Sequence, residues 1–554
     1  MRDEKRIARK TKTVCGGGQI LLKLGEVGAE SVTARTTPIA TGVVFKDPDP
    51  RTLFVGDQRL DEFINQMGFT RIFRLREILR SLDLTAFEAK YKAGGRQPYH
   101  PAGMLGLILF GIMEGRNSLR ELETLGRSDV RTWWLTGGVM PNYSVICRFI
   151  NRNTDVLTEE FFEQLTRQIL RRTSSTGKRV AIDGTVIQAA ASRYRTIKQE
   201  AAKQAAQEAR RKADQNSSDQ KLAARAEQSE RVAEVAKERS AEREKKKRKN
   251  QDAPVCPSEP DAVVQQLKTK AFAPGYKGSV AANDDRIITA KAVHPTSETA
   301  VVPGLVDQTE RVANERVSEL MDDAGYHCKA LLAHAVEHDI NLLCPSGRAD
   351  GGEESWERKS DKFFPKYKFR FDEANDVYIC PKGQRLERDH VYRGNAQNPA
   401  YTQYRCVVCC DCPLRKRCTR SAYRSVRRYA EDELREAMRM VMKQPQARQR
   451  YRQRQAMVEP VHGEIKYIQN LMRFRRRGLK KVSLEYSLHC AAHNLRRYVR
   501  LCGPSAAANG RHMLNTAQSW LAHAAFHAKS LMTTIGVNGR SENTCRHVPM
   551  LQAA

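Results

Sequence analysis

At Lys178 the spacing of the apolar residues changes, and this change limits the possible folds more than any other feature. Before it, segments such as LDEFINQMGF and FRLREILRSL carry apolar residues at helical spacing. The segment KRVAIDGTVIQA has instead the β-branched residues of a buried strand. Strand and helix patterns then alternate as far as INLLCPSG. This order predicts an all-α region followed by a mixed α/β sheet.

The sheet-forming part of the chain is interrupted. From Thr196 to Asn250 there is no Gly and no Pro, and the abundant Ala, Glu, Gln, Lys and Arg favour one or two exposed helices. We therefore expect an insertion here. The predicted regions are a loosely ordered leader at 1–50, a helical domain at 51–175, a sheet domain formed from 176–195, 255–350 and 425–502, a charged helical insertion at 196–254, a Cys-rich insertion at 351–424 and a tail at 503–554.

The charge of the chain indicates its partner. Its 554 residues include 95 Lys and Arg against 64 Asp and Glu, a formal net charge of +31. Such an excess suggests a polyanion, most simply nucleic acid, although a ribosome-associated or merely basic protein would share it. The most apolar run, Met104–Met113, is much shorter than the roughly 20 residues that cross a bilayer. We therefore expect a cytoplasmic, nucleoid-associated protein without membrane contact.

One pair of short helices could read DNA. Gly137 and Gly138 break the helical pattern, which restarts at Tyr143–Arg152. Two short helices about a glycine-containing turn fit a helix-turn-helix, with the second as recognition helix and Arg148 as a DNA contact. An ordinary helical bundle without DNA contact fits the same pattern.

Three acidic residues lie where a metal site would need them. Two-metal phosphoryl transfer requires carboxylates that converge on one point, and in open α/β sheets such sites form at strand ends. Asp183 is a charge within an apolar strand, which is costly unless it is paired or metal-bound. Asp323 follows another short strand, with Asp322 as its rival. Glu459 lies before Pro460, which predicts a helix start or a kink. The nearest competitor of Glu459 is Glu464.

The segments around these acids resemble a known family. VAIDGTVIQAAAS, LMDDAGY and YRQRQAMVEPVHGEIK, with RRRGLKKVSLEYSLHCAAHNL after the third, are similar to the catalytic blocks of bacterial insertion-sequence DDE transposases. The resemblance extends from about residue 60 to about residue 500. It implies an RNase H-like catalytic domain behind a helical N-terminal domain.

The resemblance also implies a chemistry. Asp183, Asp323 and Glu459 would hold Mg²⁺ or Mn²⁺, and the enzyme would cut DNA at the transposon ends and transfer the freed strand into target DNA. No nucleotide cofactor is expected, in agreement with the absence of a GxxxxGK[ST] motif from the sequence. Related transposases usually act as dimers, so a homodimer is expected. A catalytically silent DNA-binding relative and a nuclease that cuts without joining are the alternatives.

The resemblance of the third block also implies roles for residues around Glu459. Transposases of this kind place a Tyr and an Arg before the Glu and a Lys after it, and Tyr451, Arg454 and Lys466 can fill these positions. One branch of the family keeps three residues between Arg and Glu, whereas four separate them here. The basic run RFRRRGLKK could contact phosphates or could be a solvated loop. The DNA-binding candidates within this run are Arg473, Arg475, Arg476 and Arg477.

Six cysteines lie within 39 residues, which suggests metal binding in a reducing compartment. A CxxC pair with further thiols can form a closed tetrahedral zinc site of structural type. The predicted ligands are Cys380, Cys409, Cys412 and Cys418, with Cys406 or Cys410 as alternatives. Free thiols are the other interpretation.

Overall fold

The computed structural model describes residues 43–245, 253–267, 270–345, 363–364, 366–395 and 400–502. Most of the leader predicted at 1–50 and all of the tail predicted at 503–554 lie outside these ranges. Contacts divide the chain into a unit ending at Val499 and a second unit that begins at Arg500.

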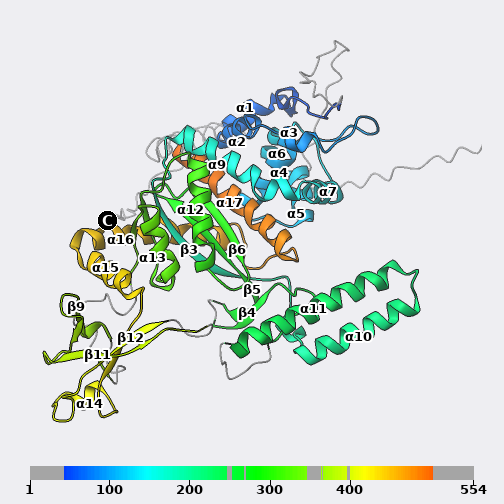
Figure 1. The fold of residues 1–554 in the computed structure, drawn as a ribbon. Coiled ribbons are helices and arrows are strands. Elements are labelled where there is room, and N and C mark those ends of the chain that lie inside the picture. Colours follow the sequence, from blue (N-terminus) through cyan, green and yellow to red (C-terminus); the bar gives the residue numbers. More distant parts are fainter. Residues whose placement is uncertain are drawn as a thin grey trace, which may run out of the picture. The chain divides into compact units, whose positions relative to one another are not determined.

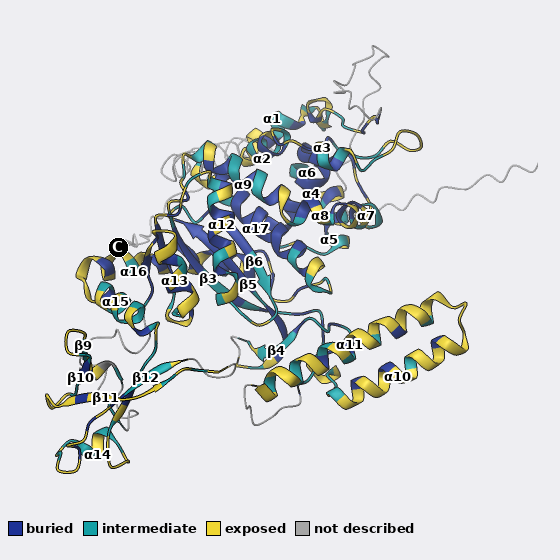
Figure 2. Cartoon of the chain, in the orientation of Figure 1, coloured by how far each residue is buried: buried dark blue, intermediate teal, exposed yellow. Residues whose placement is uncertain are grey.

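The N-terminal region is helical, as predicted. Its helices are α1 (Leu60–Gln66), α2 (Arg71–Arg80), α3 (Thr85–Glu88), α4 (Pro101–Met113), α5 (Leu119–Ser128), α6 (Val130–Thr136), α7 (Tyr143–Arg152), α8 (Thr154–Thr158) and α9 (Glu160–Thr173). A two-stranded ribbon of β1 (Phe54–Val55) and β2 (Gln58–Arg59) precedes them. Every residue of α4 is buried, so this apolar helix is the core of the region (Figure 2). In the described residues no helix has the length and apolar character needed to cross a membrane.

The predicted mixed α/β sheet is confirmed (Figure 1). Its strands are β3 (Arg179–Gln188), β4 (Val263–Gln266), β5 (Phe272–Asn283), β6 (Ile288–His294), β7 (Glu319–Met321) and β8 (Asn341–Leu343). Strand β5 pairs antiparallel with β3, β4 and β6, whereas β7 is parallel to both β3 and β8. Antiparallel strands followed by parallel ones are consistent with the RNase H-like sheet that the resemblance implies.

Helices cover both faces of this sheet. On one face, Val180 and Ile182 of β3 share a core with α12 (Val302–Ala313) and α13 (Lys329–Glu337). Successive strand residues point to opposite faces, so Asp183 points to the other face, where it meets α16. The remaining C-terminal helices are α15 (Asp432–Lys443), α16 (Pro445–Gly463) and α17 (Leu479–Leu501).

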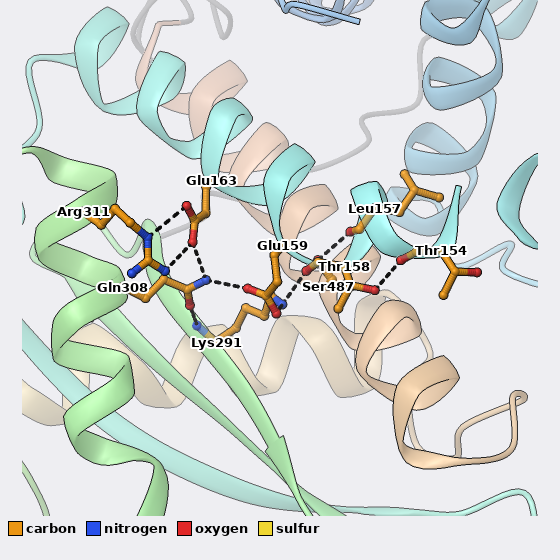
Figure 3. A network of polar contacts seen from close by, with 9 residues as sticks. All are labelled: Thr154, Leu157, Thr158, Glu159, Glu163, Lys291, Gln308, Arg311 and Ser487. Atoms are coloured by element: carbon orange, nitrogen blue, oxygen red, sulfur yellow. Dashed lines mark hydrogen bonds and ion pairs between the residues drawn. The ribbon is translucent and has the colours of Figure 1, made fainter. Parts of the chain in front are cut away.

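A polar network joins the helical region to the sheet (Figure 3). The buried ammonium of Lys291 on β6 lies 2.7 Å from the carboxylate of Glu159, where α9 begins. The amide of Gln308 on α12 donates to both Glu159 and Glu163, and Arg311 also pairs with Glu163. These contacts attach α9 to β6 and α12. The buried charge among them is that of Lys291, which is stable inside the protein only because it is paired with Glu159.

The charged insertion is a helical hairpin, as predicted. Helices α10 (Gln199–Gln215) and α11 (Gln220–Lys245) lie side by side (Figure 1). Small residues, mainly alanines, form the buried seam between them. At the base, Ile197 and Val255 exchange two backbone hydrogen bonds of 2.8 and 2.9 Å, which brings the two ends of the insertion together.

The Cys-rich insertion contains an antiparallel sheet that the sequence analysis did not predict. Its strands are β9 (Arg370–Asp372), β10 (Val377–Ile379), β11 (Arg385–Tyr392), β12 (Tyr401–Arg405) and β13 (Ser425–Arg428), with the short helix α14 (Arg415–Cys418) after β12. Its small core consists of aromatic and apolar side chains with buried cysteines. Apart from β11, these strands are five residues long or shorter, which is too short for a clear apolar pattern.

Candidate active site and metal centres

Asp183 is the centre of the candidate site. It lies in the middle of β3, and its side chain is 22 % exposed. One carboxylate oxygen is 3.1 Å from the guanidinium of Arg454, and the other is 3.7 Å from Nε2 of His462. Burial raises the pKa of Asp183 above its ordinary value, and Arg454 opposes this shift. The strand thus carries an acid that is held close to Arg454 and His462 of α16.

Asp322 and Asp323 follow β7 directly, in different surroundings. Because Ala181 pairs with Met321, the end of β7 lies beside the part of β3 that carries Asp183. Asp322 is fully buried, and its carboxylate oxygens accept no hydrogen bond from the described residues; burial raises its pKa to about 8. Asp323 is partly exposed, and one of its oxygens accepts the N–H of Gly325 at 2.7 Å. Asp323 is therefore the more accessible of the two.

A further carboxylate, which the sequence analysis missed, lies over Gly184. A Cβ at Gly184 would be 2.7 Å from Cγ of Glu298 and 2.9 Å from the buried hydroxyl of Tyr326. Glu298 pairs with Lys277 of β5 at 3.2 Å, and its charge contributes to the raised pKa of Asp183. Only the absence of a side chain at Gly184 leaves room for these two groups. Since Glu298 lies in a loop without a strand pattern, the sequence held no signal for it.

Glu459 lies on the exposed side of α16. Its carboxylate accepts a hydrogen bond of 3.0 Å from Gln455, one turn earlier. His462, which contacts Asp183, is three residues further on and so occupies a neighbouring part of the helix surface. Glu459 is therefore at the edge of the surface that faces Asp183.

Pro460 lies within α16, so of the two predicted alternatives, a helix start or a kink, the helix start is excluded. Proline has no N–H and cannot donate to the carbonyl of Ala456, four residues earlier. The side chain of Arg286, from the turn between β5 and β6, donates to this carbonyl at 2.9 Å instead. The sheet thereby replaces the hydrogen bond that the helix lacks.

Glu464, the competitor of Glu459, points toward α17. It is buried, and its carboxylate lies 3.3 Å from His493 and 3.9 Å from Arg496. It begins a π-helical segment, Glu464–Ile468, and such segments are frequent at functional sites. Its contacts are those of a residue that joins two helices.

Lys466 is directed at β3 rather than at solvent. Its buried ammonium donates to the hydroxyl of Thr185 and, at 2.9 Å, to the carbonyl of Val186. Arg454 likewise donates to the carbonyl of Ile182 at 3.1 Å. Tyr451 is half-buried near the same site, and burial raises its pKa. Arg454 and Lys466 therefore contact the strand on either side of Asp183, whereas both were predicted to contact DNA.

The basic run is hydrogen-bonded to the residues that directly follow β3. Arg473 donates to the carbonyls of Ala189 and Ala191 at 3.0 and 3.2 Å, and Arg477 donates to that of Ala190 at 3.1 Å. The backbone N–H groups of Arg475 and Arg476 donate to the buried carboxylate of Glu485. The loop is thus positioned by specific hydrogen bonds. On α7, Arg148 is exposed, as a DNA contact would require.

Five cysteines of the Cys-rich insertion line one cavity of about 30 Å³, whereas Cys410 is exposed elsewhere. The N–H groups of Lys382 and Gln384 donate to Sγ of Cys380, both at 3.3 Å. Burial raises the pKa of Cys406 to about 11. The cysteines that line the cavity are Cys380, Cys406, Cys409, Cys412 and Cys418.

Neither site is assembled as an ion would require. Within the ranges that the structure describes, no three Asp, Glu, His or Cys side chains are already gathered closely enough to hold a metal ion. The donor sets nevertheless suit their predicted ions. Carboxylate oxygens near Asp183 are hard ligands of the kind that Mg²⁺ takes, and the thiols suit Zn²⁺.

Comparison with protein families agrees with the resemblance. Residues 379–499 match the model of a transposase DDE domain, and residues 59–152 match a transposase domain known as DUF772. The first match includes Glu459 and the cysteines, and the second includes most of the N-terminal helices. No curated protein matches the chain. Two separate regions of the chain thus match models of transposase domains, and these matches support the resemblance to insertion-sequence DDE transposases.

Proposed function

We propose that this transposase cuts DNA at the ends of its transposon and joins the freed strand to target DNA, with Mg²⁺ or Mn²⁺ at Asp183, Asp323 and Glu459. The observation that supports it most is the position of Asp183. This acid lies on the central strand, beside the end of β7 that precedes Asp323, and it contacts the helix that carries Glu459.

The roles of the residues follow from their contacts. A bound metal ion would polarise the phosphodiester and stabilise its developing charge. Arg454 opposes the rise in pKa that burial causes at Asp183, since it favours the charged form. The N–H of Gly325 holds one oxygen of Asp323 and leaves the other for a ligand. Lys466, in the π-helical segment that follows α16, donates to β3 and so attaches this end of the helix to the strand.

The test is cleavage of DNA that carries the terminal repeats of the element. The parent should nick this DNA only with Mg²⁺ or Mn²⁺, and Asp183→Asn, Asp323→Asn and Glu459→Gln should bind it without nicking. Glu464→Gln separates Glu459 from its competitor, because it should retain metal-dependent nicking. If the parent binds but never nicks, the protein is a silent DNA-binding relative. If nicks form without joined products, it is a nuclease.

Assembly and location belong to the same proposal. We expect a homodimer on paired ends, which mass measurement of the protein with and without end DNA can detect. In cells, we expect the protein to be bound to the nucleoid.

We further propose that the Cys-rich insertion holds a structural Zn²⁺ through Cys380, Cys409, Cys412 and Cys418. All four thiols line one cavity, and two N–H groups donate to Sγ of Cys380. Cys406 lines the same cavity and stays an alternative ligand.

The zinc content of the purified protein tests the proposed zinc site directly. The purified parent should contain one zinc per chain, and Cys380→Ser or Cys412→Ser should lose it. Cys410→Ser is the matched control, since its thiol lies outside the cavity. Cys406→Ser shows whether this fifth thiol takes part. A parent free of zinc after purification without chelators would refute the proposal.

A further inference from the structure

A groove of about 780 Å³ lies between the helical region and the C-terminal part of the sheet domain. Its floor is apolar and includes Ile108 and Ile112 of α4 and Leu488 of α17. Its sides come from the start of α5, from α7 and from the basic loop at 475–477. Ala190, just beyond the end of β3, also lines it. The groove is therefore shared by the two regions that match transposase domains.

The rim of the groove is basic. Besides the three arginines at 475–477, Arg120 of α5 and Lys481 of α17 line it, and no ion pair within the described residues involves these two. The acid in the lining is Glu485, whose carboxylate already accepts two backbone N–H groups. His489 is neutral, because burial lowers its pKa to about 3. The lining thus carries the five basic side chains of Arg120, Arg475, Arg476, Arg477 and Lys481 against the single carboxylate of Glu485.

An exposed aromatic ring lies at one side. Tyr143, the first residue of α7, is 45 % exposed, and the guanidinium of Arg120 lies 5.7 Å from the centre of its ring. The backbone N–H of Tyr143 donates to Glu123, which fixes α7 against α5. Aromatic rings and arginines beside a basic groove are the groups on which nucleic-acid strands stack and pair.

We propose that this groove holds a stretch of sugar–phosphate backbone of the transposon-end DNA. The helical region and the C-terminal part of the sheet domain then contact the same segment of DNA. The phosphates contact Arg120 and Lys481, and Tyr143 packs against an adjacent sugar or base. The loop that forms one side is hydrogen-bonded to the end of β3, the strand that carries Asp183. DNA held here is thereby placed relative to the candidate active site. The inference rests on the proposed function only in taking DNA as the substrate.

Two pairs of variants test the groove. Arg120→Gln and Lys481→Gln remove one rim charge each. Two control variants remove the same charges outside the groove. Arg127 is on the same helix as Arg120 but is already paired with Glu123, so Arg127→Gln is the control for Arg120→Gln. Lys480 is adjacent to Lys481 but outside the lining, so Lys480→Gln is the control for Lys481→Gln. Binding of a fluorescent 30-base-pair duplex of arbitrary sequence is measured by anisotropy over a series of salt concentrations. Each groove variant should weaken binding several-fold and reduce the salt dependence of log K by about one.

The controls should match the parent in affinity and in salt dependence. Tyr143→Ala should weaken binding without changing the salt dependence, since it removes no charge. Melting curves of all five variants check that they fold. If the four charge variants behave alike, the groove is not a DNA site. If the groove variants change only the oligomeric state, the surface joins copies of the chain, and the proposal is wrong. A parent that binds DNA through this groove but never nicks it contradicts the proposed function alone.

Discussion

The guanidinium of Arg454 lies 3.1 Å from the carboxylate of Asp183 and also donates to the carbonyl of Ile182. Removal of one partner from a buried ion pair costs about 3–5 kcal/mol. We expect Arg454→Met to lower the free energy of unfolding by up to about this amount and to reduce nicking strongly. Denaturant titration and a nicking assay measure the two effects.

Arg450→Met is the control, because the side chain of Arg450 is on the same helix and mostly exposed, and its partner Glu319 also accepts a hydrogen bond from Asn341. This variant should lose about 1 kcal/mol or less. Equal losses of unfolding free energy in both variants would mean that the contact with Asp183 contributes no more to stability than the pair of Arg450 with Glu319.

Asp322 makes the stability of the chain depend on pH. Its pKa is about 8 when folded, against 3.8 ordinarily, so the folded chain holds this proton more tightly. Unfolding releases the proton between these values. The free energy of unfolding therefore falls as pH rises through this window, by at most about 1.4 kcal/mol per pH unit.

Asp322→Asn should thus be more stable than the parent at pH 8, and its melting temperature should change less between pH 5 and pH 8. Asp323→Asn keeps Asp322 and should keep the pH dependence of the parent. If Asp322→Asn follows the parent over this range, the buried carboxyl does not titrate there. If it abolishes nicking while Asp323→Asn does not, Asp322 is the metal ligand.

Arg286 and Pro460 should be energetically coupled through the carbonyl of Ala456. Loss of Arg286 removes the donor to this exposed carbonyl, so Arg286→Met should cost about 0.5–1.5 kcal/mol. In a Pro460→Ala background the helix regains its own donor, and the same change should cost at least about 0.5 kcal/mol less. A double-mutant cycle by denaturant unfolding gives the difference. Additive effects would show that the two residues act independently.

Two glycines should respond in opposite directions to alanine. At Gly184 the added Cβ collides with Glu298 and Tyr326, and overpacking of this kind costs about 1–3 kcal/mol. At Gly304 in α12 a Cβ meets nothing within 4 Å, and alanine should stabilise the helix by about 0.5–1 kcal/mol. The melting temperatures of the two variants should therefore lie on either side of that of the parent. A neutral Gly184→Ala would mean that Glu298 and Tyr326 can move aside.

The elements with strong periodicity could be predicted from the sequence. Strand β3, the β5–β6 hairpin and α12 follow their apolar patterns, and α7 has the predicted bounds Tyr143–Arg152. The small sheet of the Cys-rich insertion was missed, because its strands are short and irregular in pattern.

The candidate site could be predicted only in part. The sequence marked Asp183 as an unusual charge, but it could not show that Arg454 and Lys466 turn inward to β3. Both residue types are usually exposed, and their burial depends on partners that are far away in the chain. Glu298 was missed for the same reason, since it reaches Gly184 only through the fold. The metal ligands stay predictions.

The helical insertion departs from the sheet domain and returns to it at Ile197 and Val255, which are hydrogen-bonded to each other. The rest of the domain therefore needs only a short connection at this place. Evolution could lengthen, shorten or exchange the hairpin of α10 and α11 without shifting β3 or β5. The same junction is a natural position for grafting a foreign module onto the enzyme.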